Sequence, residues 1–237
     1  PESVTLLGRD AELGLLRDAF RASCAGAKPV IVLLSGESGI GKSALCDIFL
    51  AELAIERRAV VLSGRCFERE SVPFKAFDVV VDELSRYLRK LGNDAYGIMP
   101  RDAFALQRIF PVLGRVPAIA EAPAREVPDA QELRRRGFRA FAELLARIRD
   151  REPLVVHLDD LQWSDTDSTA LLMHLLDHAD APPLFLIASH RSEHMQGHPY
   201  LSPLYRTLPA NVQLDVRRLH LGPLPREAAR TLLGATL

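Results

Sequence analysis

The sequence predicts an α/β protein in which helices flank a parallel β-sheet. Short apolar runs alternate with amphipathic helical patterns, and the most distinctive polar residues follow the ends of those runs. The runs have the length and β-branched bias of buried strands. They cover Val30–Leu34, Ala59–Leu62, Leu154–Leu158 and Leu184–Ala188, and an alternating fifth run covers Val212–Val216.

The composition is that of an ordinary globular protein. Of 237 residues, 48% are hydrophobic and 26% are charged, which is enough apolar material for a sizeable core. The formal net charge of −1 gives no electrostatic case for binding a nucleic acid or a membrane. No apolar stretch reaches the roughly 18 residues of a membrane span. Three scattered cysteines suit a reducing compartment, so we expect a cytoplasmic protein.

The first apolar run leads into a glycine-rich loop with the P-loop pattern Gly-x-x-x-x-Gly-Lys-Ser. Its glycines permit tight turns. Its backbone amides can donate hydrogen bonds to phosphate oxygens, and the N-terminus of the helix that follows adds partial positive charge. We expect Lys42 to reach the β- and γ-phosphates and Ser43 to ligate Mg²⁺. The candidate nucleotide-binding residues are Gly36, Glu37, Ser38, Gly39, Ile40, Gly41, Lys42, Ser43 and Ala44.

Two acids, Asp159 and Asp160, follow the third run. A carboxylate at the end of a buried strand needs a partner, and in a P-loop protein that partner is hydrated Mg²⁺. We therefore assign Asp159 to the metal, with Ser43, and Asp160 to polarising the attacking water. Arg191 and Ser189, after the fourth run, are candidates for sensing the γ-phosphate, and Arg191 is favoured for its reach and fixed charge.

The region from Cys66 to Glu152 is predicted to be mainly helical. Pro73 fits the first turn of a helix that ends at Gly92, and a second helix, interrupted at Pro111, is expected over about 102–113. The Pro- and Ala-rich stretch 116–128 is predicted to be an ordered loop. Helix caps are predicted at Asp10, at Asp129 with Glu132, and at Ser164 with Asp167.

The first half of the helix after Asp129 carries Arg134, Arg135, Arg136 and Arg139. These arginines fit a solvated helix face better than a phosphate contact.

Trp163 is more simply a packing anchor than a nucleotide sensor.

These motifs together resemble the STAND branch of the AAA+ P-loop ATPases. The resemblance rests on Leu7-Gly8-Arg9, the loop at 36–43, Leu-Asp-Asp-Leu-Gln-Trp at 158–163, Ser-His-Arg at 189–191 and Leu-Gly-Pro-Leu at 221–224. The stretch that begins at Cys66 is similar to the subtype joined to bacterial serine/threonine protein kinases. Similar modules occur in large LuxR-type transcription regulators.

The resemblance implies a three-layer core with a five-stranded parallel sheet in the order 5-1-4-3-2 and a helical insertion between strands 2 and 3. It also implies that Gly8 and Arg9 lie near the adenine and that Pro223 touches the base from a hinge. We expect an ATPase core over residues 1–221 and the start of a truncated helical lid over 222–237. Many relatives have Glu where this chain has Asp160, which predicts slow hydrolysis with nucleotide binding intact.

We therefore expect a regulatory switch that binds ATP or ADP with Mg²⁺ and hydrolyses ATP slowly, within a larger bacterial signalling protein. Its expected partners are other domains of the same polypeptide and, on activation, further copies of itself, with no membrane and no direct nucleic-acid contact. Protein-kinase motifs such as His-Arg-Asp and Asp-Phe-Gly are missing from the sequence. The alternatives are a small-molecule phosphotransferase, a DNA-remodelling module and a nucleotide-locked scaffold with negligible turnover.

Overall fold

The fold is described from a computed structural model. It describes residues 8–26, 28–69, 72–124, 129–177, 181–194 and 213–225, together with residues 198, 201, 202, 205 and 208. Within these ranges no helix is both long enough and apolar enough to cross a bilayer.

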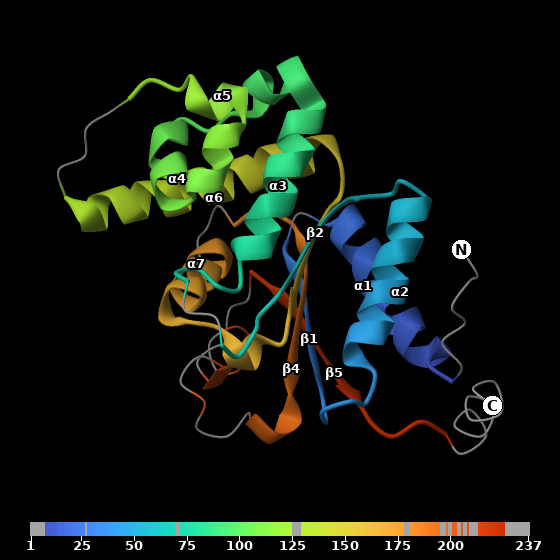
Figure 1. Cartoon of the computed structure of the whole chain (residues 1–237). Coiled ribbons are helices and arrows are strands. Elements are labelled where there is room, and N and C mark those ends of the chain that lie inside the picture. Colours follow the sequence, from blue (N-terminus) through green and yellow to red (C-terminus); the bar gives the residue numbers. More distant parts are fainter. Residues whose placement is uncertain are drawn as a thin grey trace.

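A five-stranded sheet forms the centre of the molecule, and every strand pairing in it is parallel (Figure 1). The strand order is β2-β3-β4-β1-β5, which confirms the predicted order. The strands are β1 (Val30–Gly36), β2 (Val60–Arg65), β3 (Leu154–Asp159), β4 (Phe185–Arg191) and β5 (Asp215–Leu221). In the register of the sheet Gly36 lies opposite both Arg191 and Leu221, so the carboxyl ends of the central strands meet at one edge.

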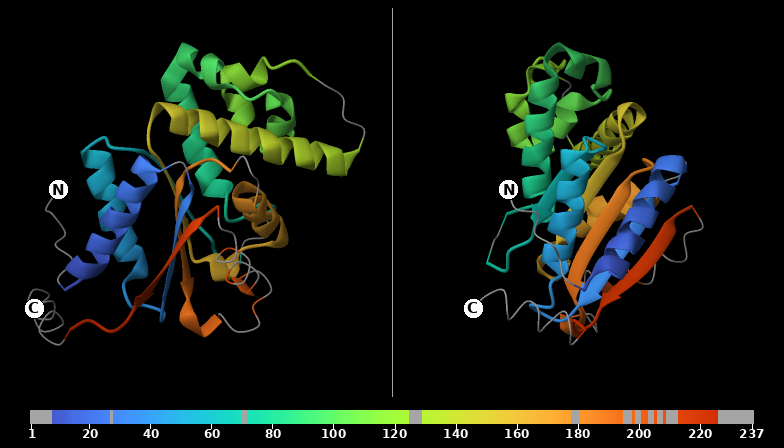
Figure 2. Two further views of the ribbon diagram at one scale, coloured as in Figure 1. Left: turned by 180° about the vertical axis from the view of Figure 1, so that it is seen from behind. Right: turned by 90° about the vertical axis from the view of Figure 1, so that its right-hand side faces the viewer.

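Helices cover both faces of the sheet and make the three predicted layers (Figures 1 and 2). One face carries α1 (Asp10–Ala25) and α2 (Lys42–Ile55), and the other carries α3 (Asp78–Leu91), α6 (Ala130–Arg151) and α7 (Thr166–Asp177). Alternate strand residues enter the two cores, because successive side chains of a strand point to opposite faces. On the α1–α2 face Phe20, Phe49 and Phe185 contact one another with ring centroids 6.0–6.3 Å apart.

The helical insertion between β2 and β3 is present as predicted. It contains α3, η1 (Gly92–Ile98), α4 (Ala103–Ile109), η2 (Pro111–Arg115), α5 (Pro117–Ala120) and α6. In Figures 1 and 2, α4 and α5 lie toward the end of the molecule away from the carboxyl edge of the sheet. The short helix α5 replaces part of the loop predicted over 116–128, since Pro117 occupies a first-turn position where its missing N–H is harmless.

Several element boundaries differ from the prediction, and the largest differences are at the fifth strand and at the helix after Pro73. The fifth strand runs over Asp215–Leu221 rather than 212–216, and Val212 lies outside the described residues. The helix predicted from Pro73 begins only at Asp78. Phe74 has a positive φ of 59°, and its backbone N–H donates to Asp165 across the fold, so the chain before α3 forms a turn instead.

One of the three predicted helix caps is confirmed. The Asp129 side chain accepts hydrogen bonds from the N–H groups of Gln131 and Glu132 at the start of α6. Asp10 is instead the first residue of α1, and Asp165 rather than Ser164 accepts from the Ser168 N–H in the first turn of α7.

Three of the four arginines between residues 134 and 139 of α6 form ion pairs with nearby acids. Arg135 and Arg136 pair with Glu132, and Arg134 pairs with Asp167 at 2.7 Å. The Arg134 guanidinium also lies 5.1 Å from the centroid of the Phe138 ring. These contacts favour the structural interpretation of the arginine run.

Close packing of α6 on α4 gives a stability prediction. A Cβ at Gly137 would lie 2.1 Å from Ile109 Cδ1 and 3.2 Å from the Ala105 carbonyl oxygen, whereas a Cβ at Gly14 in α1 meets no atom within 4 Å. Gly137→Ala should therefore lower the free energy of unfolding by about 1–2 kcal/mol. The matched control Gly14→Ala should raise it by about 0.5–1 kcal/mol, because alanine favours the helix. Urea titrations measure both changes, and equal effects would contradict the described packing.

Candidate nucleotide-binding site

The P-loop leaves the carboxyl end of β1 and enters α2 through glycines in left-handed conformations. Gly39 has φ 76° and Gly41 has φ 101°, and Gly41 is the N-cap residue of α2. Side chains with a Cβ strain this conformation, so the glycines set the shape of the loop. Gly36 has a second reason to be glycine, because a Cβ there would lie 2.8 Å from the Leu221 carbonyl oxygen.

Lys42 is buried at the start of α2 and folds back over the loop. Its Nζ donates to the carbonyl oxygens of Gly36 and Glu37, both at 2.9 Å. Burial lowers the pKa of Lys42, and the nearby acids Asp160, Glu193 and Asp159 oppose that shift. The ammonium group of Lys42 thus lies over the loop, where two backbone carbonyls accept its hydrogen bonds.

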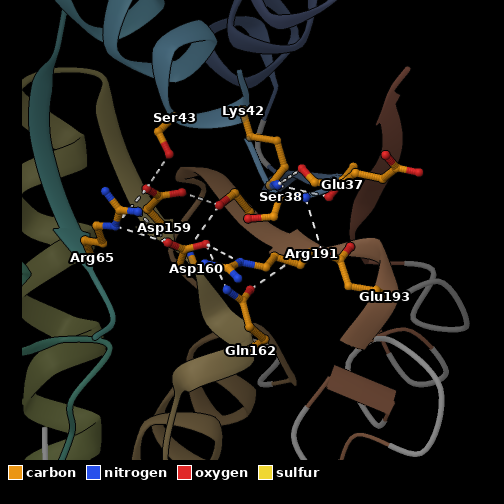
Figure 3. Close-up of polar contacts among 12 residues, drawn as sticks. Glu37, Ser38, Lys42, Ser43, Arg65, Asp159, Asp160, Gln162, Arg191 and Glu193 are labelled. Atoms are coloured by element: carbon orange, nitrogen blue, oxygen red, sulfur yellow. Dashed lines mark hydrogen bonds and ion pairs between the residues drawn. The ribbon is translucent and has the colours of Figure 1, made fainter. Parts of the chain in front are cut away.

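Ser43 and Asp159 are 116 residues apart in the chain and in direct contact. The Ser43 hydroxyl donates to Asp159 Oδ2 at 2.8 Å, and the Ser189 hydroxyl donates to Asp159 Oδ1 (Figure 3). The P-loop and the end of β3 thus face one another, as the sequence predicts. A hydroxyl and a carboxylate that converge from two elements are hard oxygen donors of the kind that Mg²⁺ prefers.

The donor set at this point fits Mg²⁺ with few protein ligands. Among the described residues, no group of three or more His, Cys, Asp or Glu side chains could hold a metal ion. Magnesium commonly keeps several waters and binds through one or two protein oxygens plus phosphates. Ser43 and Asp159 fit that pattern.

Asp160 follows β3 in a left-handed conformation, with φ 59°. Arg65, at the end of β2, donates to Asp160 Oδ2 through Nε at 3.1 Å and Nη2 at 2.7 Å. Gln162 donates to the other oxygen, Oδ1, at 2.8 Å. Burial by itself would raise the pKa of Asp160, but the hydrogen bonds from Gln162 and Arg65, together with the charges of Arg65 and Arg191, hold the pKa below its usual value.

Arg191, the predicted sensor, lies at the end of β4 next to these acids. Its Nε is 3.9 Å from Asp160 Oδ1, and its guanidinium carbon lies 5.9 Å from the centroid of the Trp163 ring. The Arg191 backbone N–H donates to Gln162 Oε1 at 3.1 Å. Ser189, the alternative sensor candidate, is committed to Asp159 and also accepts from the Asp160 N–H at 3.0 Å.

Arg9, one of the residues that the resemblance places near the base, links the P-loop to two other segments of the chain. Arg9 is buried and donates to the carbonyl oxygens of Ile40 at 3.2 Å and Gly222 at 2.7 Å. It therefore joins the start of α1, the P-loop and the segment after β5. Gly8 precedes it with φ 81°, and Pro223 is exposed beside Gly222.

Three residues of the site have no role in the sequence-based prediction: Arg65, Gln162 and Glu193. Gln162 is buried, and its side chain bridges Asp160 and the backbone of Arg191. Glu193 accepts from the Ser38 backbone N–H at 3.2 Å. A weak sequence signal existed for Arg65, which ends an apolar run just as Asp159 does, and for Gln162, which stands two residues after Asp160.

Comparison with known proteins identifies the family. A family model described as an AAA ATPase domain matches residues 5–187. The chain belongs to the AAA ATPase domain family. No curated protein is significantly similar to it.

Solved structures with a similar fold include proteins from Pyrobaculum aerophilum and Aeropyrum pernix. Cdc6p from Pyrobaculum aerophilum aligns with a TM-score of 0.54 and 14% identity, over 98% of this chain and 49% of that chain. The Aeropyrum pernix ORC1 protein, solved with DNA, aligns at 0.52 and 17%, over 98% and 49%. The Aeropyrum pernix ORC2 protein, solved as ADPNP–ADP complexes, aligns at 0.51 and 15%, over 95% and 50%. The chain spans about half the length of these proteins, and at such identities the likeness shows the fold alone.

His190, between Ser189 and Arg191, gives a pH prediction. Burial, followed by the charges of Lys42 and His198, lowers the pKa of His190 from 6.5 to about 4. The unfolded chain therefore binds a proton between those pH values that the folded chain does not, and stability falls as pH drops from 6.5 to 4. The contribution is up to about 3 kcal/mol. His190→Gln should flatten this part of the stability curve in urea titrations at pH 4.5 and 7, and an unchanged pH slope would contradict it.

Proposed function

We propose that this domain is a regulatory switch that binds ATP and Mg²⁺ at the carboxyl edge of its sheet and hydrolyses ATP slowly. The observation that supports the proposal most strongly is the contact between Ser43 and Asp159. It brings together the P-loop and the acid at the end of β3, the two parts of a nucleoside-triphosphate site. Membership of the AAA ATPase domain family supports nucleotide binding and ATPase activity in general terms.

Each residue of the edge has a proposed part. The P-loop amides from Glu37 to Ala44 and the N-terminus of α2 bind phosphate oxygens. Ser43 and Asp159 would hold Mg²⁺, which supplies charge neutralisation of the phosphates when bound. Lys42 leaves the Gly36 and Glu37 carbonyls to stabilise charge that develops on the transferred group.

Hydrolysis needs a positioned water and a reader of the γ-phosphate. Asp160 orients the water by accepting a hydrogen bond from it, and Arg191 contacts the γ-phosphate from β4. Gln162 hydrogen-bonds both the Asp160 carboxylate and the Arg191 backbone N–H, so it fixes the position of Asp160 relative to the end of β4. Gly8, Arg9 and Pro223 are proposed to border the base.

The contacts of Asp160 support slow turnover. Both carboxylate oxygens already accept hydrogen bonds, Oδ1 from Gln162 and Oδ2 from Arg65. Arg65 donates two hydrogen bonds and Gln162 one, so about one of the four lone-pair sites is left for a water, and movement of Arg65 would free two more. The same observation is what favours a nucleotide-locked scaffold as the second candidate function. A small-molecule phosphotransferase is disfavoured, because Arg134 to Arg136 pair with acids of the insertion and α7 rather than with the P-loop.

The wider context remains part of the proposal. The motifs quoted above favour the STAND branch and a bacterial signalling protein such as a serine/threonine kinase or a LuxR-type regulator. We propose that residues 1–221 form the core and that 222–237 begin a helical lid; residues 226–237 lie outside the described part of the chain. The proposed partners are the nucleotide, other domains of the same polypeptide and further copies of the chain in the cytoplasm. Direct DNA binding is not proposed, since the net charge is −1.

Substitution of Lys42 tests nucleotide binding. Lys42→Ala should abolish binding of Mg·ATP in calorimetry, because it removes the only lysine of the P-loop and leaves phosphate charge without its direct partner. Lys90→Ala, on the exposed last turn of α3, is the matched control and should bind as the wild type does. Unchanged affinity in Lys42→Ala would refute the site.

Substitution of Arg65 tests the restraint on Asp160. Arg65→Ala should raise kcat for ATP hydrolysis about threefold or more, because it frees one oxygen of the water-orienting group. It should also raise the pKa of Asp160, since a hydrogen bond to the charged form is lost. Phosphate release without any added acceptor measures turnover and also tests the phosphotransferase alternative. A drop in kcat would show instead that Arg65 supports Asp160.

A further inference from the structure

The side chain of Glu193 already accepts a hydrogen bond from one backbone amide of the P-loop. The short helix η4 (Ser192–His194) follows β4 and brings Glu193 to the mouth of the loop. Glu193 Oε1 accepts from the Ser38 backbone N–H at 3.2 Å, and Glu193 Oε2 accepts from the Ser192 hydroxyl at 3.3 Å (Figure 3). Glu37, Ser38, Ser192 and Glu193 together line an open hollow.

The chemistry of this contact is that of an anion in a phosphate cradle. The Ser38 amide belongs to the loop whose N–H groups we assign to phosphate, and a carboxylate and a phosphate oxygen compete for the same donor. We propose that Glu193 is a tethered competitor for the phosphate subsite and thereby sets which phosphate compounds the site retains. This inference rests on the proposed function, because it concerns the same P-loop.

The electrostatics of the mouth favour the same conclusion. Glu193 is one of the acids whose charge raises the pKa of Lys42 against the effect of burial, so its carboxylate lies within the field of the catalytic cation. Hydrogen bonds from its own backbone amide and then from Ser38 lower the pKa of Glu193, which keeps it ionised at neutral pH. While the Glu193 carboxylate is bound to the Ser38 amide, its negative charge reduces the positive potential that attracts a phosphate to the loop.

The contact can also open. Glu193 is exposed, η4 is three residues long, and the carboxylate makes one hydrogen bond to the loop. A ligand with two or three phosphates contacts several loop amides and Lys42 at once and displaces Glu193. A single phosphate gains fewer contacts for the same displacement. The apparent affinity for a phosphate ligand is its intrinsic affinity multiplied by the fraction of molecules in which Glu193 is not bound to the loop. Ligands whose intrinsic affinity is already weak then bind too weakly to be retained.

Four proteins test the inference: the wild type, Glu193→Gln, Glu193→Asp and Glu68→Gln. Glu193→Gln removes the charge, and Glu193→Asp keeps the charge but is one methylene too short for Ser38. Glu68→Gln is the matched control, because it removes one negative charge from an exposed residue that follows β2 and has no proposed part in the site. Calorimetry with ADP and with inorganic pyrophosphate gives the affinities, and the Ser38 amide proton in NMR reports the contact in the free protein.

We expect Glu193→Gln and Glu193→Asp each to bind ADP and pyrophosphate about three- to tenfold more tightly than the wild type. Both should shift the Ser38 amide proton upfield, because a hydrogen bond to a charged acceptor is lost. Glu68→Gln should change the affinity less than twofold. Equal gains in Glu193→Gln and Glu68→Gln with no gain in Glu193→Asp would overturn the inference in favour of a general charge effect.

The outcomes separate this inference from the proposed function. If the wild type binds ADP and no Glu193 variant binds it more tightly, the tethered competitor is refuted and the nucleotide site stands. If neither the wild type nor any variant binds ADP or pyrophosphate, both proposals fail together.

Discussion

The hydrogen bond between Ser43 and Asp159 is the contact on which the rest of the site depends. It joins the first turn of α2 to the end of β3, two elements that meet because the parallel strands finish at one edge. Glycines at 39 and 41 let the chain turn from β1 into α2 at the distance this contact requires. Lys42, Asp160 and Arg191 then gather around it from three different elements.

A second constraint is the concentration of charge at this edge. Asp159 and Asp160 are both buried, and unpaired buried carboxylates are unfavourable. The fold satisfies them with neutral donors from Ser43, Ser189 and Gln162 and with the charged donor of Arg65. Because Arg65 is half-exposed, its contact is the one that can be exchanged most readily for another partner. Arg65 is therefore the contact that, in the proposed function, changes when nucleotide binds.

The sequence predicts the parts of this site that are local in the chain. The P-loop and the two acids follow strand ends, so a motif and its apolar run suffice to place Gly36 to Ser43 and Asp159. The strand order came only from the resemblance. Arg65, Gln162 and Glu193 were missed because their partners lie in other elements, and nothing in a single sequence pairs residue 65 with 160 or 193 with 38. Phe74 and Asp165 show the same limit, since a contact between them replaces a predicted helical turn and a predicted cap.

The most direct measurement of the central claim is metal binding at the two facing oxygens. Mn²⁺ is a paramagnetic substitute for Mg²⁺, and its binding in the presence of a non-hydrolysable ATP analogue can be followed by electron paramagnetic resonance. The account predicts tight Mn²⁺ binding that requires the analogue and is lost in both Ser43→Ala and Asp159→Asn. Equal Mn²⁺ affinity in the wild type and in Asp159→Asn would contradict it.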